Sequence, residues 1–184
     1  PIYQFGGRGV DKRVAQNLRV KGALVEAYLR LLGTYPDDNI SVTMIAREAG
    51  VSRMAYYRNF ESKGDIIRYF LEEVFREILG QLSEGCTFWS REYGYVLLNV
   101  LYRHREQFLL LDESGHGGMV LAMFNDASLE LAGDVPYNSV ERYRLYLASG
   151  ATLNGIMEWF RGDCRESLDD FFAVMLDFLG ANIA

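Results

Sequence analysis

Proline, cysteine and histidine are scarce in this sequence of 184 residues, which has three prolines, two cysteines and two histidines. Cys86 and Cys164 form no Cys-x-x-Cys pair, and neither His104 nor His116 lies close to them in the sequence. This number and spacing disfavour a Cys/His zinc site or a disulfide scaffold. No apolar run approaches the roughly 18 residues of a membrane helix, and the amino-terminal residues lack a basic-then-apolar signal pattern. We therefore expect a cytoplasmic protein without a metal, a cofactor or a membrane partner.

The long interval without proline between Pro36 and Pro136 favours helices, because proline breaks them. Apolar residues recur at three- and four-residue spacing, whereas alternation with a period of two is not sustained anywhere. The segment from Ile67 to Leu82 is the clearest amphipathic helix, since charged residues separate its apolar positions. Hydrophobic residues make up 49% of the chain and charged residues 24%, as in ordinary globular proteins. The sequence predicts an all-α fold.

We expect about nine helices in two domains. Residues 1–62 would hold an amino-terminal arm and three helices, and residues 63–184 the remainder, with the first helix of this second domain as a connector. The expected helices are Asp11–Leu32, Val42–Ala49, Arg53–Asn59, Lys63–Leu82, Phe88–Tyr102, Arg103–Leu111, Met119–Ala132, Ser139–Phe160 and Leu168–Ala181. Three pairs at capping-box spacing predict helix starts, namely Ser62 with Asp65, Asn138 with Glu141, and Ser167 with Asp170.

Charge is distributed unevenly along the chain, whose formal net charge is −6. The segment up to Lys63 has ten Lys and Arg against six Asp and Glu, a net charge of +4, whereas the remainder has nine against nineteen, a net charge of −10. A basic amino-terminal third on an acidic body indicates that one end meets a polyanion. On charge alone, chance clustering of solvated charges remains an alternative. Arg8, Lys12 and Arg13 are either an arm on DNA or a basic tail.

Residues 41–60 predict two short helices that cross at a sharp turn. Gly50 can adopt the positive φ that such a turn requires, Ala46 is small enough for a close crossing, and Ser52 can cap the second helix. Apolar contacts beneath the two helices come from Ile45, Ala49 and Val51. This pattern is that of a helix-turn-helix unit, which presents its second helix to the major groove of DNA. For the spacing alone, two packed helices of another bundle remain the alternative.

The same window resembles the TetR family of transcriptional regulators. The shared motifs are Ile-Ala-x-x-Ala-Gly-Val-Ser at Ile45–Ser52, Tyr-x-x-Phe at Tyr57–Phe60, and the following Lys63, and the likeness extends over Val14–Leu82. The resemblance implies that the first three helices bind double-stranded DNA. It also implies that the remaining helices bind a small-molecule effector and form a homodimer, and that the protein represses transcription until the effector binds.

Transferred position by position, the resemblance implies a set of DNA-binding side chains. Thr43, Arg53 and Met54 would approach base edges, where the Arg53 guanidinium fits guanine and Met54 fits a thymine methyl group. Tyr57 and Lys63 would donate to phosphates, and Arg58 and Asn59 would meet the groove or the backbone. The complete expected set is Thr43, Ser52, Arg53, Met54, Tyr57, Arg58, Asn59 and Lys63. The family often has Gly then Thr where this chain has Met54 and Ala55, so we expect one hydroxyl contact to be absent.

The last two expected helices are apolar around too much of their circumference for ordinary surface helices. A twofold four-helix interface would bury the excess, as the family resemblance also implies. The expected interface residues are Gly150, Ala151, Gly155, Val174 and Phe178. The segment from Tyr146 to Trp159 and the loop before Ser167 also resemble regulators related to dihydroxyacetone-kinase control.

An effector pocket is expected among the helices of the second domain. Aromatic and methionine walls with a few polar groups are typical of such pockets, although for each residue alone ordinary core is the better interpretation. The candidates are Trp89, Tyr93, Tyr102, His104, Phe108, Met119, Met123, Phe124, Tyr143 and Met157.

The sequence therefore favours a ligand-responsive, dimeric DNA-binding regulator, most simply a repressor on an inverted-repeat operator. An activator or partner-binding protein with weakened sequence-specific DNA binding is the alternative that Met54 and Ala55 permit. A small helical enzyme is a distant alternative, because no spacing links the cysteines, histidines and acids into a catalytic group and no phosphate-binding loop follows a strand.

Overall fold

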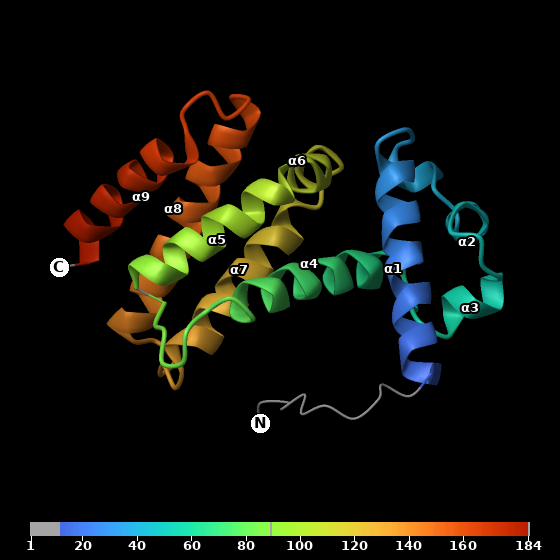
Figure 1. Ribbon diagram of the computed structural model, residues 1–184, viewed down its shortest axis with the longest axis horizontal. Helices are drawn as coiled ribbons and strands as arrows, with labels where there is room; N and C mark the ends of the chain where they lie inside the picture. The colour runs from blue at the N-terminus through green and yellow to red at the C-terminus, as the bar shows by residue number, and fades with distance from the viewer. Residues whose placement is uncertain (1–11, 89, 184) are drawn as a thin grey trace. The chain divides into compact units, whose positions relative to one another are not determined.

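The structure is a computed structural model that describes residues 12–88 and 90–183. Within these ranges the chain forms nine α-helices and one short 3-10 helix, η1, without β-strands (Figure 1). The helices are α1 (Lys12–Leu32), η1 (Asp37–Asn39), α2 (Val42–Glu48), α3 (Arg53–Tyr57), α4 (Lys63–Leu79), α5 (Arg91–Arg103), α6 (Arg105–Glu113), α7 (Gly117–Ala132), α8 (Val140–Arg161) and α9 (Leu168–Ile183). The predicted all-α class is confirmed.

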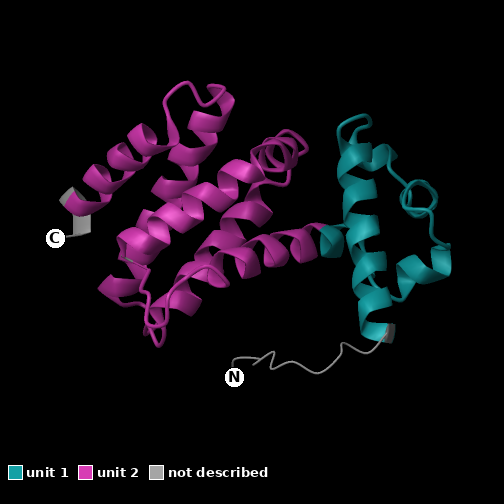
Figure 2. Ribbon diagram, in the orientation of Figure 1, with its two compact units in different colours: residues 1–66 teal, residues 67–184 magenta. Residues whose placement is uncertain are grey.

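Two compact units make up the chain, unit 1 (Pro1–Ile66) and unit 2 (Ile67–Ala184) (Figure 2). The division falls inside α4, whereas the sequence-based boundary lay at the start of this helix. The first residue of α4, Lys63, binds Asp37, so the first turn of the helix is tied to the loop that follows α1. Neither unit contains a helix that is long and apolar enough to span a membrane among the residues the structure describes.

Several helix ends differ from the expected ones for local reasons. Helix α4 ends at Leu79 rather than Leu82, because Gly80 follows and glycine is a poor helix former. Helix α5 begins at Arg91 rather than Phe88, since the Ser90 hydroxyl caps it by accepting the Tyr93 N–H at 3.0 Å. These differences move the boundaries of helices that the apolar periodicity had already located.

Two of the three predicted capping pairs are confirmed. Ser62 and Asp65 form a reciprocal capping box, in which each side chain accepts the backbone N–H of the other. Ser167 accepts the Asp170 N–H at 3.2 Å at the start of α9. The Asn138 prediction is wrong, because Asn138 has a φ of +57° and the neighbouring Ser139 caps α8 through the Arg142 N–H.

Unit 1 is built around α1, which packs on α2, while α2 packs on α3. Its core includes Leu24, Tyr28 and Ile45, each fully buried. Tyr56 of α3 is also fully buried, and its ring meets Phe60 edge to face. The short α3 is thus held in place by an aromatic residue on its inner side.

Asp37 is a polar anchor of unit 1. Its carboxylate accepts a hydrogen bond from the Tyr28 hydroxyl at 2.7 Å and lies 2.7 Å from the Lys63 ammonium. Burial raises the pKa of Tyr28 well above its ordinary value, and the hydrogen bond to Asp37 adds to the rise. The anchor joins α1, the loop before α2 and the start of α4.

The Tyr28 anchor predicts a loss of stability in alkaline solution. An unfolded tyrosine ionises near pH 10, whereas folded Tyr28 keeps its proton, so the free energy of unfolding falls as the pH rises above about 10. We expect the Tyr28→Phe variant to lose about 1 kcal/mol at neutral pH and to show a shallower decline above pH 10. Urea unfolding of both proteins between pH 7 and 11 measures this. Parallel declines would contradict the role of Tyr28.

Unit 2 is a helical bundle in which α7 packs on α8, while α9 packs on both α5 and α8. Gly94 allows the α5–α9 approach, because a Cβ at this position would lie 3.2 Å from the Phe172 ring and 3.3 Å from the Met175 methyl group. Trp159 of α8 is stacked between two rings, with centroids 5.4 Å from Tyr102 and 4.7 Å from Phe171. These aromatic contacts link α5, α8 and α9 on one side of the bundle.

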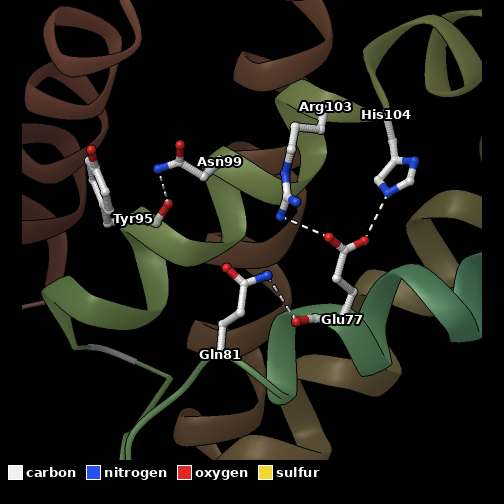
Figure 3. Close-up of polar contacts among 6 residues, drawn as sticks. All are labelled: Glu77, Gln81, Tyr95, Asn99, Arg103 and His104. Carbon is white, nitrogen blue, oxygen red and sulfur yellow. Dashed lines mark hydrogen bonds and ion pairs between the residues drawn. The ribbon is translucent and has the colours of Figure 1, made fainter.

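Glu77 links α4 to the junction of α5 and α6. One carboxylate oxygen lies 2.8 Å from the Arg103 guanidinium, and the other lies 3.0 Å from the His104 imidazole (Figure 3). The His104 ring also meets Phe70 of α4 edge to face. The part of α4 in unit 2 is therefore held by both polar and aromatic contacts.

Candidate functional site

The turn between α2 and α3 has the geometry that the sequence predicts. Gly50 has a φ of +66°, the left-handed conformation that glycine adopts without strain. The Ser41 hydroxyl caps α2 through the Met44 N–H, and the Ser52 hydroxyl caps α3 through the Ala55 N–H at 3.1 Å. Both short helices therefore begin directly after a serine that caps them, and the capped start of α3 follows the turn at Gly50.

The outer side of α3 presents polar and apolar groups next to one another. Arg53 and Arg58 are exposed, the Met54 side chain is 62% exposed, and Tyr57 is 52% exposed. Because most of its surface is exposed, Met54 contributes little buried apolar area to the core of unit 1. We refer to Arg53, Met54, Tyr57 and Arg58 as the α3 face.

Thr43 and Ser52, two other residues of the expected DNA-binding set, are exposed near the starts of α2 and α3. Ser52 uses one lone pair of its hydroxyl oxygen to cap α3, and its proton can still be donated to a phosphate. Of the basic arm that we expected at the amino terminus, Arg8 lies outside the described residues.

Asn59 and Lys63, two residues that the resemblance places on DNA, have partners within unit 1. The Asn59 amide donates to the Ala55 carbonyl at 2.7 Å and accepts from the Asn17 amide of α1 at 2.7 Å. Lys63 pairs with Asp37 and also donates to the Asp37 backbone carbonyl. Both side chains thus stabilise unit 1, and Asn17 is a positioning residue for α3 that no local sequence signal indicates.

A surface hollow lies between α1 and α3, next to the α3 face. It has a volume of about 370 Å³, and the side chains of Arg13, Asn17 and Arg58 contribute to its wall. Two arginines, Arg13 and Arg58, therefore line one hollow of unit 1. Such a surface attracts phosphate groups.

Unit 2 contains a mostly apolar cavity with a volume of about 290 Å³. Helices α5, α7, α8 and α9 supply its walls, which are aromatic, aliphatic and hydroxyl side chains. The lining residues are Phe88, Ser90, Tyr93, Gly94, Leu97, Phe124, Ser128, Ser149, Thr152, Met175, Leu176, Leu179 and Gly180. Burial in this wall raises the pKa of Tyr93, whose phenol therefore stays protonated well into the alkaline range.

The cavity includes part of the effector set expected from the sequence. Tyr93 and Phe124 line it, and a small adjoining space is lined by Phe108 and Met123 as well. Five other candidates lie elsewhere. Tyr102 stacks on Trp159, His104 binds Glu77, and Met157 is buried away from the cavity lining. Tyr143 is exposed on α8, and Met119 of α7 lines neither space. Trp89 is outside the described residues.

Sequence reasoning missed the hydroxyl groups of the cavity. Ser128 and Ser149 are buried inside unit 2, and Thr152 lies nearby in the wall. Aromatic and methionine residues were expected in a pocket, whereas serines within helices gave no such indication. The sequence does place these residues on the apolar sides of α7 and α8, and a polar side chain in such a position indicates a buried hydrogen-bonding group.

Helices α8 and α9 expose a row of apolar side chains. Leu147 is 74% exposed and Val174 is 65% exposed, while Phe178 is about half exposed. A Cβ added at Gly150 would meet no atom within 4 Å, so this part of α8 is open. Gly155 instead faces Phe171 of the same chain, which a Cβ at Gly155 would approach to 3.9 Å. We refer to Leu147, Gly150, Val174 and Phe178 as the α8–α9 face.

Residues 12–88 and 90–183 bring together no group of three or more His, Cys, Asp or Glu side chains that could hold a metal ion.

A comparison with protein families matches residues 24–70 to the family described as bacterial regulatory proteins, tetR family. This match covers the α2–α3 turn, the α3 face and the Asp37 anchor. No curated protein sequence matches the chain significantly.

Solved structures share the fold at low sequence identity. One is named dihydroxyacetone kinase operon activator DhaS, with a TM-score of 0.61, 18% identity, and coverage of 89% of this chain and 96% of that chain. A TetR transcriptional regulator from Streptococcus agalactiae 2603V gives a TM-score of 0.63 at 17% identity, covering 91% and 97%. The fatty acid degradation regulator FadR from Bacillus halodurans gives 0.56 at 17% identity, covering 87% and 94%. Residues 24–70 thus match the model of the tetR family of bacterial regulatory proteins, and the chain shares the fold of solved structures that include a TetR transcriptional regulator.

Proposed function

We propose that this protein is a transcription regulator that binds double-stranded DNA as a homodimer and responds to a small molecule bound in unit 2. The α3 face is the observation that carries the proposal, because a capped helix exposes two arginines, a tyrosine and a methionine. The arginines suit guanine edges and phosphates, the tyrosine hydroxyl suits a phosphate, and the methionine suits a thymine methyl group.

The homodimer is proposed on the α8–α9 face. Exposed apolar side chains on two long helices that pack on each other are typical of a surface that is covered by another chain. A twofold axis would place two copies of α8 and α9 together in a four-helix interface. It would also present two copies of α3 to successive major grooves, about 34 Å apart, so we expect an inverted-repeat operator.

Ligand response is proposed through the unit 2 cavity. A ligand changes DNA affinity by the difference between its affinities for the DNA-binding state and for the other state. Part of α4 belongs to each unit, so this helix is the covalent route along which such a change would pass.

Repression is the simplest consequence of this mechanism, and activation is the second candidate. The solved structure named as an operon activator shares the fold over most of both chains, which supports activation as a possible output. The Met54–Ala55 pair also remains compatible with weakened sequence-specific binding. Transcription from a reporter under the protein's own upstream region distinguishes repression from activation by the sign of its change when the protein is expressed.

The proposal predicts steeply salt-dependent DNA binding. Arg53, Tyr57 and Arg58 on each protomer, together with backbone amides, would displace several counterions from the DNA. A plot of log affinity against log salt concentration is then expected to have a slope of roughly −4 to −8, at about 0.9 per neutralised phosphate. Fluorescence anisotropy with a labelled duplex from the protein's own upstream region measures this slope. Affinity that stays constant between low and physiological salt would contradict DNA binding.

A further inference from the structure

The side chains that the structure describes in the lining of the unit 2 cavity carry no charge. Among the described lining residues are three serines and a threonine, a tyrosine, and otherwise apolar side chains and glycines. An ionised group placed in such a wall would lose its hydration without gaining a counter-charge, which is strongly unfavourable. The wall therefore favours a neutral ligand.

The Ser149 hydroxyl is a buried group of this wall that lacks a hydrogen-bond partner. Ser149 is 2% exposed, and its Oγ has no hydrogen-bond partner in the described structure. The other hydroxyls with known partners are engaged: Ser128 donates to the Phe124 carbonyl at 2.7 Å, and Ser90 caps α5. Buried hydroxyl groups without a partner are rare, because their desolvation is not compensated. A ligand atom that binds Ser149 would supply the missing hydrogen bond.

The size of the cavity limits the ligand. An engineered apolar cavity of about 150 Å³ holds benzene, so the volume of about 290 Å³ suits a molecule about twice that size. Ser149 and Thr152 of α8 form one side of the space, and Leu97, Met175 and Leu179 contribute apolar surface. A ligand would therefore place most of its atoms on hydrocarbon and one polar atom at α8.

We infer that the cavity binds a small neutral molecule with a predominantly apolar body and one hydroxyl or carbonyl group, which the Ser149 hydroxyl anchors. This inference rests on the ligand response in the proposed function and specifies the chemical class of the effector. It makes Ser149 a specificity-determining residue of the cavity.

Three probes with the same chain length test the charge preference. Isothermal titration calorimetry of the full chain without DNA compares 1-octanol with octanoate and octylammonium at pH 7.5. We expect 1-octanol to bind at least tenfold more tightly than either ion, because only the ions must be desolvated as charges. Octanoate or octylammonium binding as tightly as 1-octanol would overturn the neutral class, and so would an absence of 1-octanol binding.

Two matched variants test the anchor. The Ser149→Ala variant is expected to weaken 1-octanol binding about five- to tenfold and to leave the binding of 1-chlorooctane, which lacks the hydroxyl, unchanged. Ser128→Ala removes another buried cavity hydroxyl whose hydrogen bond is already made, so it is expected to weaken 1-octanol binding less than twofold. Equal effects of both variants, or no effect of Ser149→Ala, would overturn the role of Ser149.

Methyl NMR locates the bound probe independently of affinity. The Met175 methyl resonance is expected to shift on addition of 1-octanol, because Met175 lines the cavity, whereas that of exposed Met54 in unit 1 should not shift. A shift at Met54 without one at Met175 would place the probe elsewhere and overturn the assignment.

The two proposals can fail separately. If 1-octanol binds at Met175 and does not change the affinity for DNA, the proposed ligand response is wrong, whereas the inferred ligand class is supported. If the protein binds DNA but binds none of the probes, the inferred ligand class is wrong, whereas the proposed DNA binding is supported.

Discussion

Replacing Phe178 or Leu147 with glutamate is expected to convert the dimer to a monomer. Both side chains lie on the α8–α9 face, where the new carboxylate would lose its hydration against the partner at a large cost in free energy. Glutamate is a good helix former, so the helices themselves should persist. Sedimentation velocity is expected to show the change of mass, and DNA binding should become weak and sensitive to salt, because one recognition helix replaces two. We expect a loss of at least a hundredfold in operator affinity, about 3 kcal/mol, since one half-site is lost.

A matched control separates this interface from a general effect of charge. Leu121 of α7 is also an exposed apolar residue of unit 2, and it lies outside the α8–α9 face. The Leu121→Glu variant is therefore expected to remain dimeric and to bind DNA normally. If the Phe178 and Leu147 variants keep their fold by circular dichroism and also remain dimeric, the interface has been placed on the wrong helices.

Arg53→Ala is expected to reduce the affinity for the preferred operator by about 1 to 3 kcal/mol and to relax the base preference at one position in each half-site. The reason is geometric: Arg53 is the first residue of α3, is exposed, and has a planar guanidinium that can donate twice to guanine. Competition binding against a set of operator duplexes with single base changes measures both effects.

Two other substitutions make this test specific. Arg47→Ala removes an exposed arginine from the last turn of α2 and is expected to change specific and random DNA binding equally, if it changes either. Lys63→Ala leaves Asp37 without its cation, so we expect its main effect on the stability of unit 1. Equal losses for Arg53→Ala on specific and random DNA would show that Arg53 contacts phosphate alone.

The helix-turn-helix region could be predicted from the sequence because its determinants are local. Gly50 must be glycine for the turn, Ser52 must accept a backbone N–H three residues later, and Ile45 must face inward. Each requirement acts over a few residues and leaves a recognisable residue type. The apolar periodicity located the remaining helices for the same reason, and the errors concern their ends.

The partners of individual polar side chains could not be predicted, because they come from distant parts of the chain. Asn59 binds Asn17 of α1, and Lys63 binds Asp37, so two residues of the expected DNA-binding set also have partners within unit 1. The cavity shows the same limit. An aromatic residue such as Tyr102 has the composition of a pocket wall but stacks on Trp159, whereas Ser149 lies in the wall without a recognisable local pattern.

Helix α8 has two neighbouring sides with different tasks. Ser149 and Thr152 line the cavity, while Leu147 and Gly150 lie on the α8–α9 face. Each residue of an α-helix is rotated by about 100° from the one before it, so inserting a single residue near Tyr146 would turn every later side chain away from its side. We therefore expect the length of α8 to be kept among relatives that diverge elsewhere, with insertions and deletions confined to the segment between Gly162 and Ser167. Changes in the ligand preference of such proteins would then come from substitutions along α8. Each of these substitutions would also have to preserve the dimer that α8 helps to form.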